Sequence, residues 1–203
     1  ATVLQGAGLK GVEVCANGVS PINILDKVPA NKLVLGYLAG AAQYKGYHLM
    51  RAAVTKGAFE NLRLVVVDHS LKQNQVVREK WGTSEVERIG FVPQEQIAAL
   101  YARLNVVLVP SIWPESFGLV AREGLKSGSW LVASNRGAAA EDVIEGQNGH
   151  VFDPGIPGDF SRVLALLNDN TDRYKAMPVA TPIRSTTQQA EELLVMYESL
   201  ARR

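Results

Sequence analysis

The feature that most constrains this chain is an alternation of short, continuously apolar runs with longer amphipathic segments. We predict strands at residues 33–38, 62–67, 86–89, 106–109, 130–134 and 150–152. We predict helices at residues 46–56, 71–81, 94–103, 117–127, 138–144, 157–167 and 184–201. Continuous apolar strands that alternate with helices are typical of a parallel sheet buried on both faces. The expected fold is therefore α/β, a Rossmann-like parallel β-sheet with helices on both faces.

Composition narrows the class of protein further. The chain has 203 residues and a formal net charge of +1, which gives no basic field for nucleic acid. Cys15 is the single cysteine and excludes an internal disulfide framework. No apolar run reaches the ~18 residues of a membrane span. We expect no nucleic-acid partner, no transmembrane segment and a cytoplasmic protein that is peripheral at the membrane in its full-length form.

The ends of the chain differ from its middle. Residues 1–18 are rich in glycine and fit no strand-helix unit, so we expect an interdomain linker or the tail of a missing N-terminal domain. Residues 19–183 are expected to form one Rossmann-like domain. Pro178 and Pro182 mark a joint, after which residues 184–203 are expected as a C-terminal helix that packs back on the domain.

One motif near the start is set aside. Residues 6–11 match the G-x-G-x-x-G pattern of dinucleotide-binding proteins. That pattern needs a preceding strand and a helix that opens at the glycines, so that the helix N-terminus faces the pyrophosphate. Strand and turn residues follow here instead, including Asn17-Gly18. We interpret the match as accidental, which counts against a nicotinamide enzyme.

The most informative stretch is residues 106–123, VVLVPSIWPESFGLVARE, where a predicted strand enters a loop and a helix follows. Ser116 has the side chain of a helix N-cap, so we expect the helix to open near Phe117. Glu115 then lies at the mouth of the loop, and Glu123 lies two turns into the helix. Eight residues at helical rise span roughly 12 Å. Taken alone, two glutamates at this spacing are more simply two surface acids.

The separation also suits a nucleoside diphosphate sugar, whose sugar and ribose hydroxyls would each meet one carboxylate. Between the two, the N–H groups of Gly118 and Leu119 would face the diphosphate, where the helix dipole favours negative charge. Gly118 has no side chain, so the backbone can approach a ligand closely. The strand-loop-helix context therefore favours a nucleotide-sugar site over two unrelated acids.

Several motifs in order resemble the family 4 (group 1) glycosyltransferases, which have the two-domain GT-B fold. These motifs are Pro110-Ser111, Glu115-Ser116-Phe117-Gly118-Leu119, Glu123, Asn17-Gly18-Val19, Lys45-Gly46, Gly90-Phe91-Val92 and Asn148-Gly149. The resemblance covers roughly residues 15–200 and identifies the chain with the C-terminal, nucleotide-sugar donor-binding domain of that family.

The resemblance implies roles for individual residues. Glu115 would meet the donor sugar and Lys45 would contact the diphosphate, and these two are the candidate catalytic residues. Glu123 would hold the ribose. The other residues expected around the donor are Ser116, Phe117, Gly118, Leu119 and Gly40.

The chain departs from the family pattern in its phosphate contacts. The family's "GR" pair is Gly36-Tyr37 here, so one arginine contact is missing or comes from Arg122 or Arg136. His69 stands in place of a glycine of the family and is expected to be solvated. Gly124, in the middle of the predicted helix, suggests close packing or approach to ligand, because glycine costs about 1 kcal/mol of helix propensity.

The implied function is a retaining, hexosyltransferase-type glycosyltransferase of polysaccharide or glycoconjugate biosynthesis. Its glycan or lipid-linked acceptor would bind through the missing N-terminal domain, so that this fragment alone is expected to be inactive. No cofactor and no metal are expected, because no D-x-D motif stands at a strand end. The alternatives are a non-catalytic nucleotide-sugar-binding domain and a GT-B-fold sugar-nucleotide epimerase. The nucleotide base and the sugar stay open.

Overall fold

The computed structural model describes residues 6–8 and 12–202. The chain divides into two compact units. The larger unit is Ile22–Pro182 and contains the whole sheet. The smaller unit joins the two end segments of the chain, and its described residues are 6–8, 12–21 and 183–202.

Seven strands form a single sheet in the larger unit. Their bounds are β1 Leu33–Tyr37, β2 Leu62–Val67, β3 Val76–Trp81, β4 Ser84–Ile89, β5 Val106–Val109, β6 Trp130–Ser134 and β7 Gly149–Phe152. The strand order is β3-β4-β2-β1-β5-β6-β7. All neighbouring strands are parallel except β3, which pairs antiparallel with β4. The predicted parallel α/β sheet is confirmed, and β3 extends it by one antiparallel edge strand.

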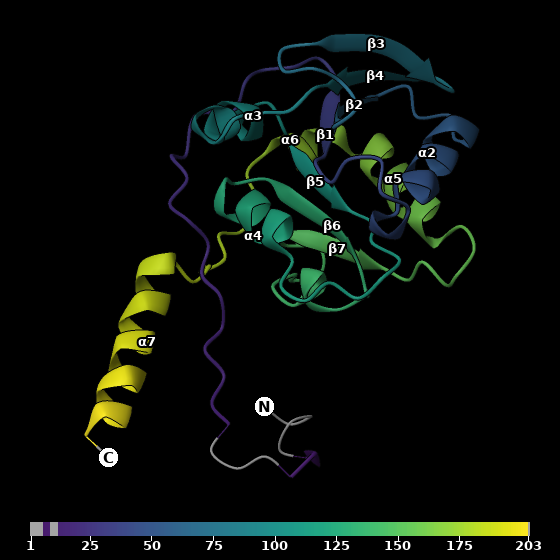
Figure 1. Ribbon diagram of the computed structural model, residues 1–203. Coiled ribbons are helices and arrows are strands. Elements are labelled where there is room, and N and C mark those ends of the chain that lie inside the picture. The colour runs from purple at the N-terminus through teal and green to yellow at the C-terminus, as the bar shows by residue number, and fades with distance from the viewer. Residues whose placement is uncertain (1–5, 9–11, 203) are drawn as a thin grey trace. The chain divides into compact units, whose positions relative to one another are not determined.

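Helices cover both faces of this sheet (Figure 1). One layer contains α2 Tyr47–Lys56, α5 Asp159–Asp169 and the short α6 Thr171–Lys175, which was not predicted. The other contains α3 Ile97–Ala102 and α4 Leu119–Lys126. Three short 3₁₀ turns, η1 Gln43–Lys45, η2 Gln94–Gln96 and η3 Ala138–Ala140, lie in the connections.

The two faces of each strand meet different helices because successive side chains point to opposite sides. In β1, Leu33 and Leu35 join the main core with α2, α5 and α6. Gly36 points the other way, where an added Cβ would lie 2.3 Å from a methyl group of Leu104. In α4, a Cβ at Gly124 would lie 2.9 Å from Val107 of β5. The close packing suggested by Gly124 is thus confirmed.

The predicted helix at residues 71–81 is wrong. The second half of that segment is β3, whose exposed and half-buried residues alternate as in a strand with one solvated face. A two-residue turn, Gly82-Thr83, joins β3 to β4 and pairs Trp81 with Ser84. Gly82 has φ of +58°, which glycine adopts without steric cost. The turn allows residues 76–81 to pair with β4 as a strand.

The predicted helix at residues 138–144 is also wrong, since only η3 forms there. The side chain of Asn148 accepts from the backbone N–H of Ile144 at 2.7 Å and donates to the carbonyl of Asp142 at 2.9 Å. These bonds replace the backbone partners that a continuing helix would have supplied.

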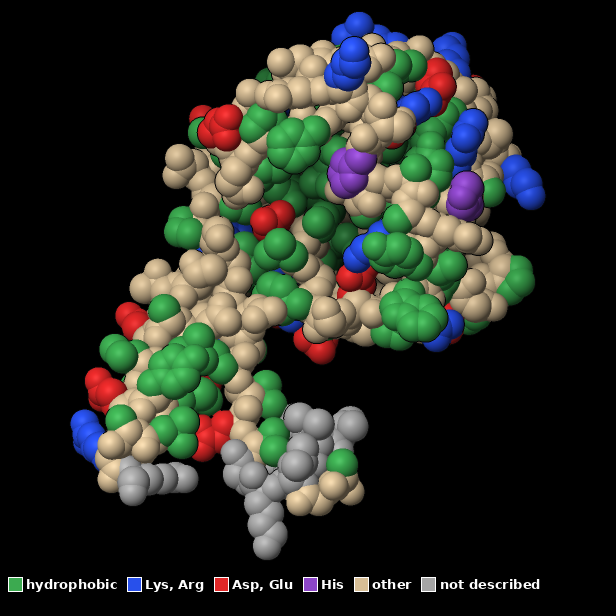
Figure 2. All heavy atoms as spheres, in the orientation of Figure 1, with side chains coloured by type: hydrophobic (Ala, Val, Ile, Leu, Met, Phe, Trp, Pro, Cys, Tyr) green, Lys and Arg blue, Asp and Glu red, His purple; other side chains and the backbone are tan. Residues whose placement is uncertain are grey.

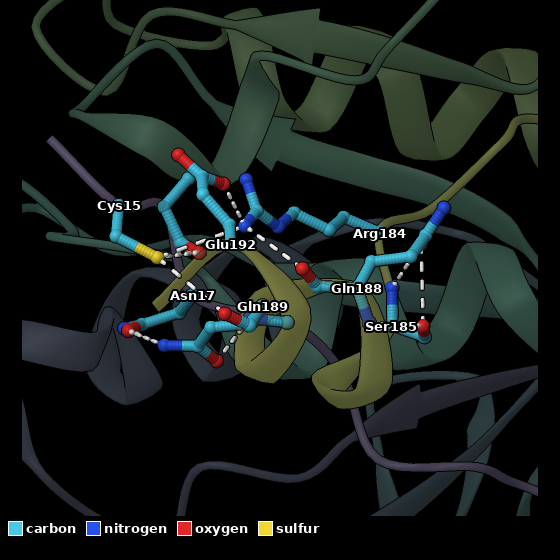
Figure 3. A network of polar contacts seen from close by, with 9 residues as sticks. Cys15, Asn17, Arg184, Ser185, Gln188, Gln189 and Glu192 are labelled. Atoms are coloured by element: carbon cyan, nitrogen blue, oxygen red, sulfur yellow. Dashed lines mark hydrogen bonds and ion pairs between the residues drawn. The ribbon is translucent and has the colours of Figure 1, made fainter. Parts of the chain in front are cut away.

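The smaller unit is organised around α7 Thr186–Ala201. Ser185 and Gln188 form a capping box at its start, and the side chain of Gln189 bonds to Asn17 and Gly18 (Figure 3). None of the residues of α7 is buried. Hydrophobic side chains therefore gather on its surface, among them Leu194 and Tyr197 (Figure 2).

Some expectations about the chain's ends stay predictions. Leu9, Lys10 and Gly11 of the glycine pattern lie outside the described residues. The roles expected for residues 1–18 as a linker and for residues 184–203 as a helix packed on the domain are likewise untested. Within the described part of the chain, no helix is both long and apolar enough to cross a membrane.

Candidate functional site

Lys45, Glu115 and the start of α4 line one cavity at the carboxyl edge of the parallel strands, where ligands of open α/β sheets bind. The cavity holds about 210 Å³. Its walls come from Ala39 and Lys45 after β1, from residues 108–111 at the end of β5, and from residues 115–120. Six of the eight predicted site residues are therefore brought together: Lys45, Glu115, Ser116, Phe117, Gly118 and Leu119.

Lys45 is held in this cavity by the loop that follows β1. Gly46 has φ of +77°, and a Cβ there would lie 1.8 Å from the carbonyl oxygen of Pro110. The carbonyl of Tyr44 accepts from the backbone N–H groups of Ile112 and Trp113 at 3.0 and 3.3 Å. This close approach joins η1 to the loop after β5, so Gly46 is the residue that lets Lys45 reach Glu115.

Glu115 is fixed through its backbone and paired through its side chain. Its N–H donates to the carbonyl of Arg136 at 3.1 Å, and its carbonyl accepts from Ala138 at 2.8 Å. Lys45 Nζ lies 2.8 Å from both carboxylate oxygens of Glu115, and the Ser111 hydroxyl donates to Oε1. The two predicted catalytic residues thus form an ion pair with each other inside the cavity.

The N-terminus of α4 also faces the cavity, but the predicted cap is wrong. The N-cap residue is Gly118, with φ of +69°, and no side chain caps the helix. Ser116 is exposed, because the extended backbone at Glu115 delays the helix until Leu119. A Cβ at Gly118 would lie 2.8 Å from Ala139, so η3 holds this turn in place. The first N–H groups of α4, which lack intrahelical partners, remain for a ligand.

Glu123 and Gly40 are not among the residues that line the cavity. Glu123 is half-buried, and its Oε2 accepts a hydrogen bond of 2.9 Å from the hydroxyl of Tyr101. Burial raises the pKa of Glu123, and the bond from Tyr101 lowers it in part. Gly40 has φ of +67° and lies against the exposed ring of His69, whose Nδ1 would be 3.0 Å from an added Cβ.

Neither arginine proposed to replace the family's phosphate contact lines the cavity. Arg122 pairs with Glu141 and Asp142 at 3.0 and 2.8 Å and stacks on Phe117. Arg136 pairs with Asp153 at 2.8 Å. Both guanidinium groups thus have acidic partners of their own.

Two of the histidines and two of the tryptophans do not line the cavity. His150 is buried between Glu145 and Tyr174, and His48 is exposed on α2. Trp130 is buried in the core, and Trp113 is 69% exposed. Among residues 6–8 and 12–202, no three His, Cys, Asp or Glu side chains lie together as a metal site requires.

Sequence reasoning missed two side chains beside the site. Ser111 was noted only as part of a motif, yet its hydroxyl contacts Glu115 four residues on. Tyr101 carried no signal, because a tyrosine at the apolar spacing of a short helix is typical of a core residue. It is indeed 1% exposed, and its hydroxyl donates to Glu123.

A family model and several known proteins match the sequence of this chain. A family model described as "Glycosyl transferases group 1" matches residues 25–181. The chain is 29% identical over 189 residues to a D-inositol 3-phosphate glycosyltransferase of Corynebacterium jeikeium, covering 85% of this chain and 45% of the relative. A second D-inositol 3-phosphate glycosyltransferase, from Corynebacterium kroppenstedtii, is 38% identical over 85 residues, or 42% of this chain and 19% of the relative. The chain thus spans about half the length, or less, of these relatives.

Solved structures with the same fold include proteins about twice as long as this chain. A sucrose-phosphate synthase from Thermosynechococcus elongatus has a TM-score of 0.70 at 20% identity, covering 92% of this chain and 52% of that protein. HepE of Anabaena, solved in complex with UDP and glucose, has a TM-score of 0.64 at 20% identity, with coverage of 83% and 49%. These likenesses confirm the expected fold, one Rossmann-like half of the GT-B architecture.

Proposed function

Because the chain belongs to the group 1 glycosyl transferases, we propose that its larger unit binds the nucleotide diphosphate sugar of a glycosyl transfer reaction. One observation carries this proposal. A lysine, a carboxylate and an uncapped helix N-terminus line the same cavity at the carboxyl edge of the sheet. A diphosphate needs positive charge and N–H donors, and an attached sugar needs hydroxyl acceptors.

Each group would have a distinct task. Lys45 and the first N–H groups of α4 would bind the diphosphate and stabilise its charge as it leaves. Glu115 would accept hydrogen bonds from the sugar hydroxyls, and Glu123, farther along α4, would accept from the ribose. Phe117, Gly118, Leu119 and Ser116 would form the wall of the donor site, with Gly40 beside it. No metal or cofactor is needed for this scheme.

We propose further that the whole protein retains the configuration of a transferred hexose and acts in polysaccharide or glycoconjugate biosynthesis, on a glycan or lipid-linked acceptor. The names of the glycosyltransferase relatives and the UDP and glucose bound to HepE support a nucleotide-sugar donor for this chain as well. A cytoplasmic location, peripheral at the membrane, stays a prediction.

The first experiment is a thermal-shift screen of UDP, ADP and GDP and of their glucose derivatives. A ligand that binds only the folded state stabilises it by about 2.7 kcal/mol when present at 100 times its Kd. We expect one nucleoside diphosphate to raise the melting temperature clearly. The matched control is the corresponding nucleoside, which has no diphosphate for Lys45 and α4. Absence of a shift with every diphosphate and every sugar derivative would overturn the proposal.

A further inference from the structure

Tyr101 is a buried tyrosine whose hydroxyl points to the edge of the proposed site. It lies near the end of α3, is 1% exposed, and donates its hydroxyl to Oε2 of Glu123 at 2.9 Å. Tyr101 does not line the cavity around Lys45 and Glu115. Any effect it has on a ligand must therefore pass through the carboxylate that it contacts.

The backbone of Tyr101 is held firmly from outside α3. Lys27 Nζ donates to the carbonyls of Tyr101 and Leu104 at 3.1 and 2.7 Å and to the hydroxyl of Ser129 at 2.7 Å. The N–H of Val28 donates to the carbonyl of Ala102 at 2.8 Å. The three bonds to Tyr101, Ala102 and Leu104 fix the end of α3, and with it the place of the phenol ring.

Glu123 is held from the other side. Gly124 lets α4 approach Val107 of β5 closely, and the hydroxyl of Ser127 donates to the carbonyl of Glu123 at 2.7 Å. The bond from Tyr101 engages Oε2, and the second carboxylate oxygen, Oε1, can accept from a ligand. Tyr101 therefore fixes the orientation of the carboxylate through Oε2 and leaves Oε1 as an acceptor for a ligand.

We propose that Tyr101 is a positioning residue that holds the Glu123 carboxylate for the ribose hydroxyls and so sets the preference for ribonucleotides over deoxyribonucleotides. This inference rests on the proposed function, because it assumes that Glu123 meets the ribose. It adds a residue and a specificity to that site.

The titration of the pair agrees with this role. Burial raises the pKa of Glu123, which favours the neutral acid, and the hydrogen bond from Tyr101 opposes that shift. Burial and the nearby carboxylate raise the pKa of Tyr101 well above its usual value, so the phenol stays a donor. The strands β5 and β6 and the turn η3 contact α4 and carry no ionisable side chains. Glu141 and Asp142, just after η3, pair with Arg122 of α4, and Lys126 is the other charged neighbour on that helix. Of these groups, Tyr101 is the one that shifts the pKa of Glu123.

The test compares Tyr101→Phe with the wild type in calorimetric titrations with UDP, ADP and GDP and with their 2′-deoxy forms. A hydrogen bond to a charged acceptor predicts a preference of roughly tenfold or more for the ribonucleotide in the wild type. We expect Tyr101→Phe to reduce that preference to about twofold while the deoxynucleotide binds nearly as before. Glu123→Asp keeps the negative charge but moves the carboxylate away from the phenol, so it should show the same loss of preference. This variant replaces Tyr101→Phe in the test if Tyr101→Phe folds poorly.

Two further comparisons separate positioning from mere packing. Tyr174→Phe removes another hydrogen-bonded hydroxyl from a fully buried tyrosine, and it should leave the preference unchanged. In a Glu123→Gln background, Tyr101→Phe should cause no additional loss, because residues that act through one another are not additive. Loss of the phenol bond also raises the pKa of Glu123 further. The preference should then disappear at a higher pH in Tyr101→Phe than in the wild type as the pH falls.

The outcomes are distinct. If Tyr101→Phe keeps the wild-type preference, or binds the ribonucleotide and the deoxyribonucleotide more weakly by the same factor, the inference is overturned and the proposed function is unaffected. Failure of the wild type to bind any of the six nucleotides would overturn the proposed function, and this inference with it.

Discussion

At the scale of single residues, the central feature is that Lys45 and Glu115 neutralise each other. Both oxygens of Glu115 lie 2.8 Å from Lys45 Nζ, and the side chains are 29% and 14% exposed for Lys45 and Glu115. A diphosphate that binds Lys45 must therefore compete with Glu115 for the same ammonium group. Release of Glu115 from Lys45 would in turn make its carboxylate available to the sugar hydroxyls, which couples the two parts of donor binding.

This competition gives opposite expectations for two substitutions. Lys45→Met should weaken binding of a nucleoside diphosphate by about 1.5–3 kcal/mol, because a charged donor to phosphate is lost. Glu115→Gln should tighten it by up to about 1 kcal/mol, the range measured for accessible ion pairs, because Lys45 is released. Calorimetry with UDP, ADP or GDP measures both. Glu141→Gln removes the same charge from an exposed position and should have a smaller effect. Weaker binding after Glu115→Gln would contradict the competition.

The site could be predicted from sequence only where a residue lies in a local pattern. Lys45, Glu115 and Gly118 each belong to a loop at a strand end, and six of the predicted residues do share one cavity. Ser116 was misassigned as a cap because the pairing of Glu115 with the loop before Ala138 is a long-range contact. Tyr101 was missed for the same reason, since the partner of its hydroxyl, Glu123, lies in another helix.

At the scale of elements, the position of η1 depends on Gly46. Gly46→Ala would combine a left-handed conformation, costing about 1–3 kcal/mol for a non-glycine residue, with a clash against the Pro110 carbonyl. We expect η1 to move away from the loop after β5, so that the protein is less stable and nucleoside diphosphates bind less well. Gly158→Ala is the matched control: φ is +85°, but nothing lies within 4 Å of an added Cβ.

Thermal denaturation measures the stability of the two variants, and the same calorimetric titration measures their affinity for nucleotide. Gly158→Ala should lose about 1–2 kcal/mol of stability, the cost of the left-handed conformation, and bind nucleotide normally. Gly46→Ala should lose more stability and should also lose affinity. Equal effects of the two substitutions would show that the approach of η1 to Pro110 does not position Lys45.

The β3–β4 hairpin shows why some elements escaped prediction. Residues 71–81 contain many good helix formers, and Gly82 after them is equally typical of a helix end and of a turn. Pairing with β4 decided otherwise, because Trp81 is buried against α2, with its ring 6.0 Å from that of Tyr47. Local propensity was overridden by contacts with β4 and with α2, which lies earlier in the chain.

At the scale of the whole molecule, the parallel sheet was predictable because its central strands are apolar on both faces. The four residues of β5 and the five of β1 are all buried, a pattern that a half-solvated sheet cannot show. The edge strand β3 lacks that pattern, since it is solvated on one face. Sequence therefore predicts the centre of this sheet better than its edge.

The last prediction concerns what the 203-residue chain does by itself. Its cavity of about 210 Å³ is smaller than the roughly 300–1,000 Å³ of pockets that bury most of a small ligand. Much of a nucleotide sugar bound there would stay in water, where Lys45 and the dipole of α4 are screened. Positioning of an acceptor, worth roughly 7–11 kcal/mol of a barrier, needs a second surface opposite this site.

We therefore expect the chain alone to bind donor nucleotide and to catalyse at most slow donor hydrolysis. The measurement incubates the chain with the sugar nucleotide that binds best and with inositol phosphate, glycan and lipid-linked acceptors, and follows both free nucleotide and glycosylated product. Glu123→Gln, assayed beside it, should abolish even the slow hydrolysis if that activity comes from this site. Rapid transfer that depends on an acceptor would show that the larger unit, with the cavity beside Lys45, already forms a complete active site.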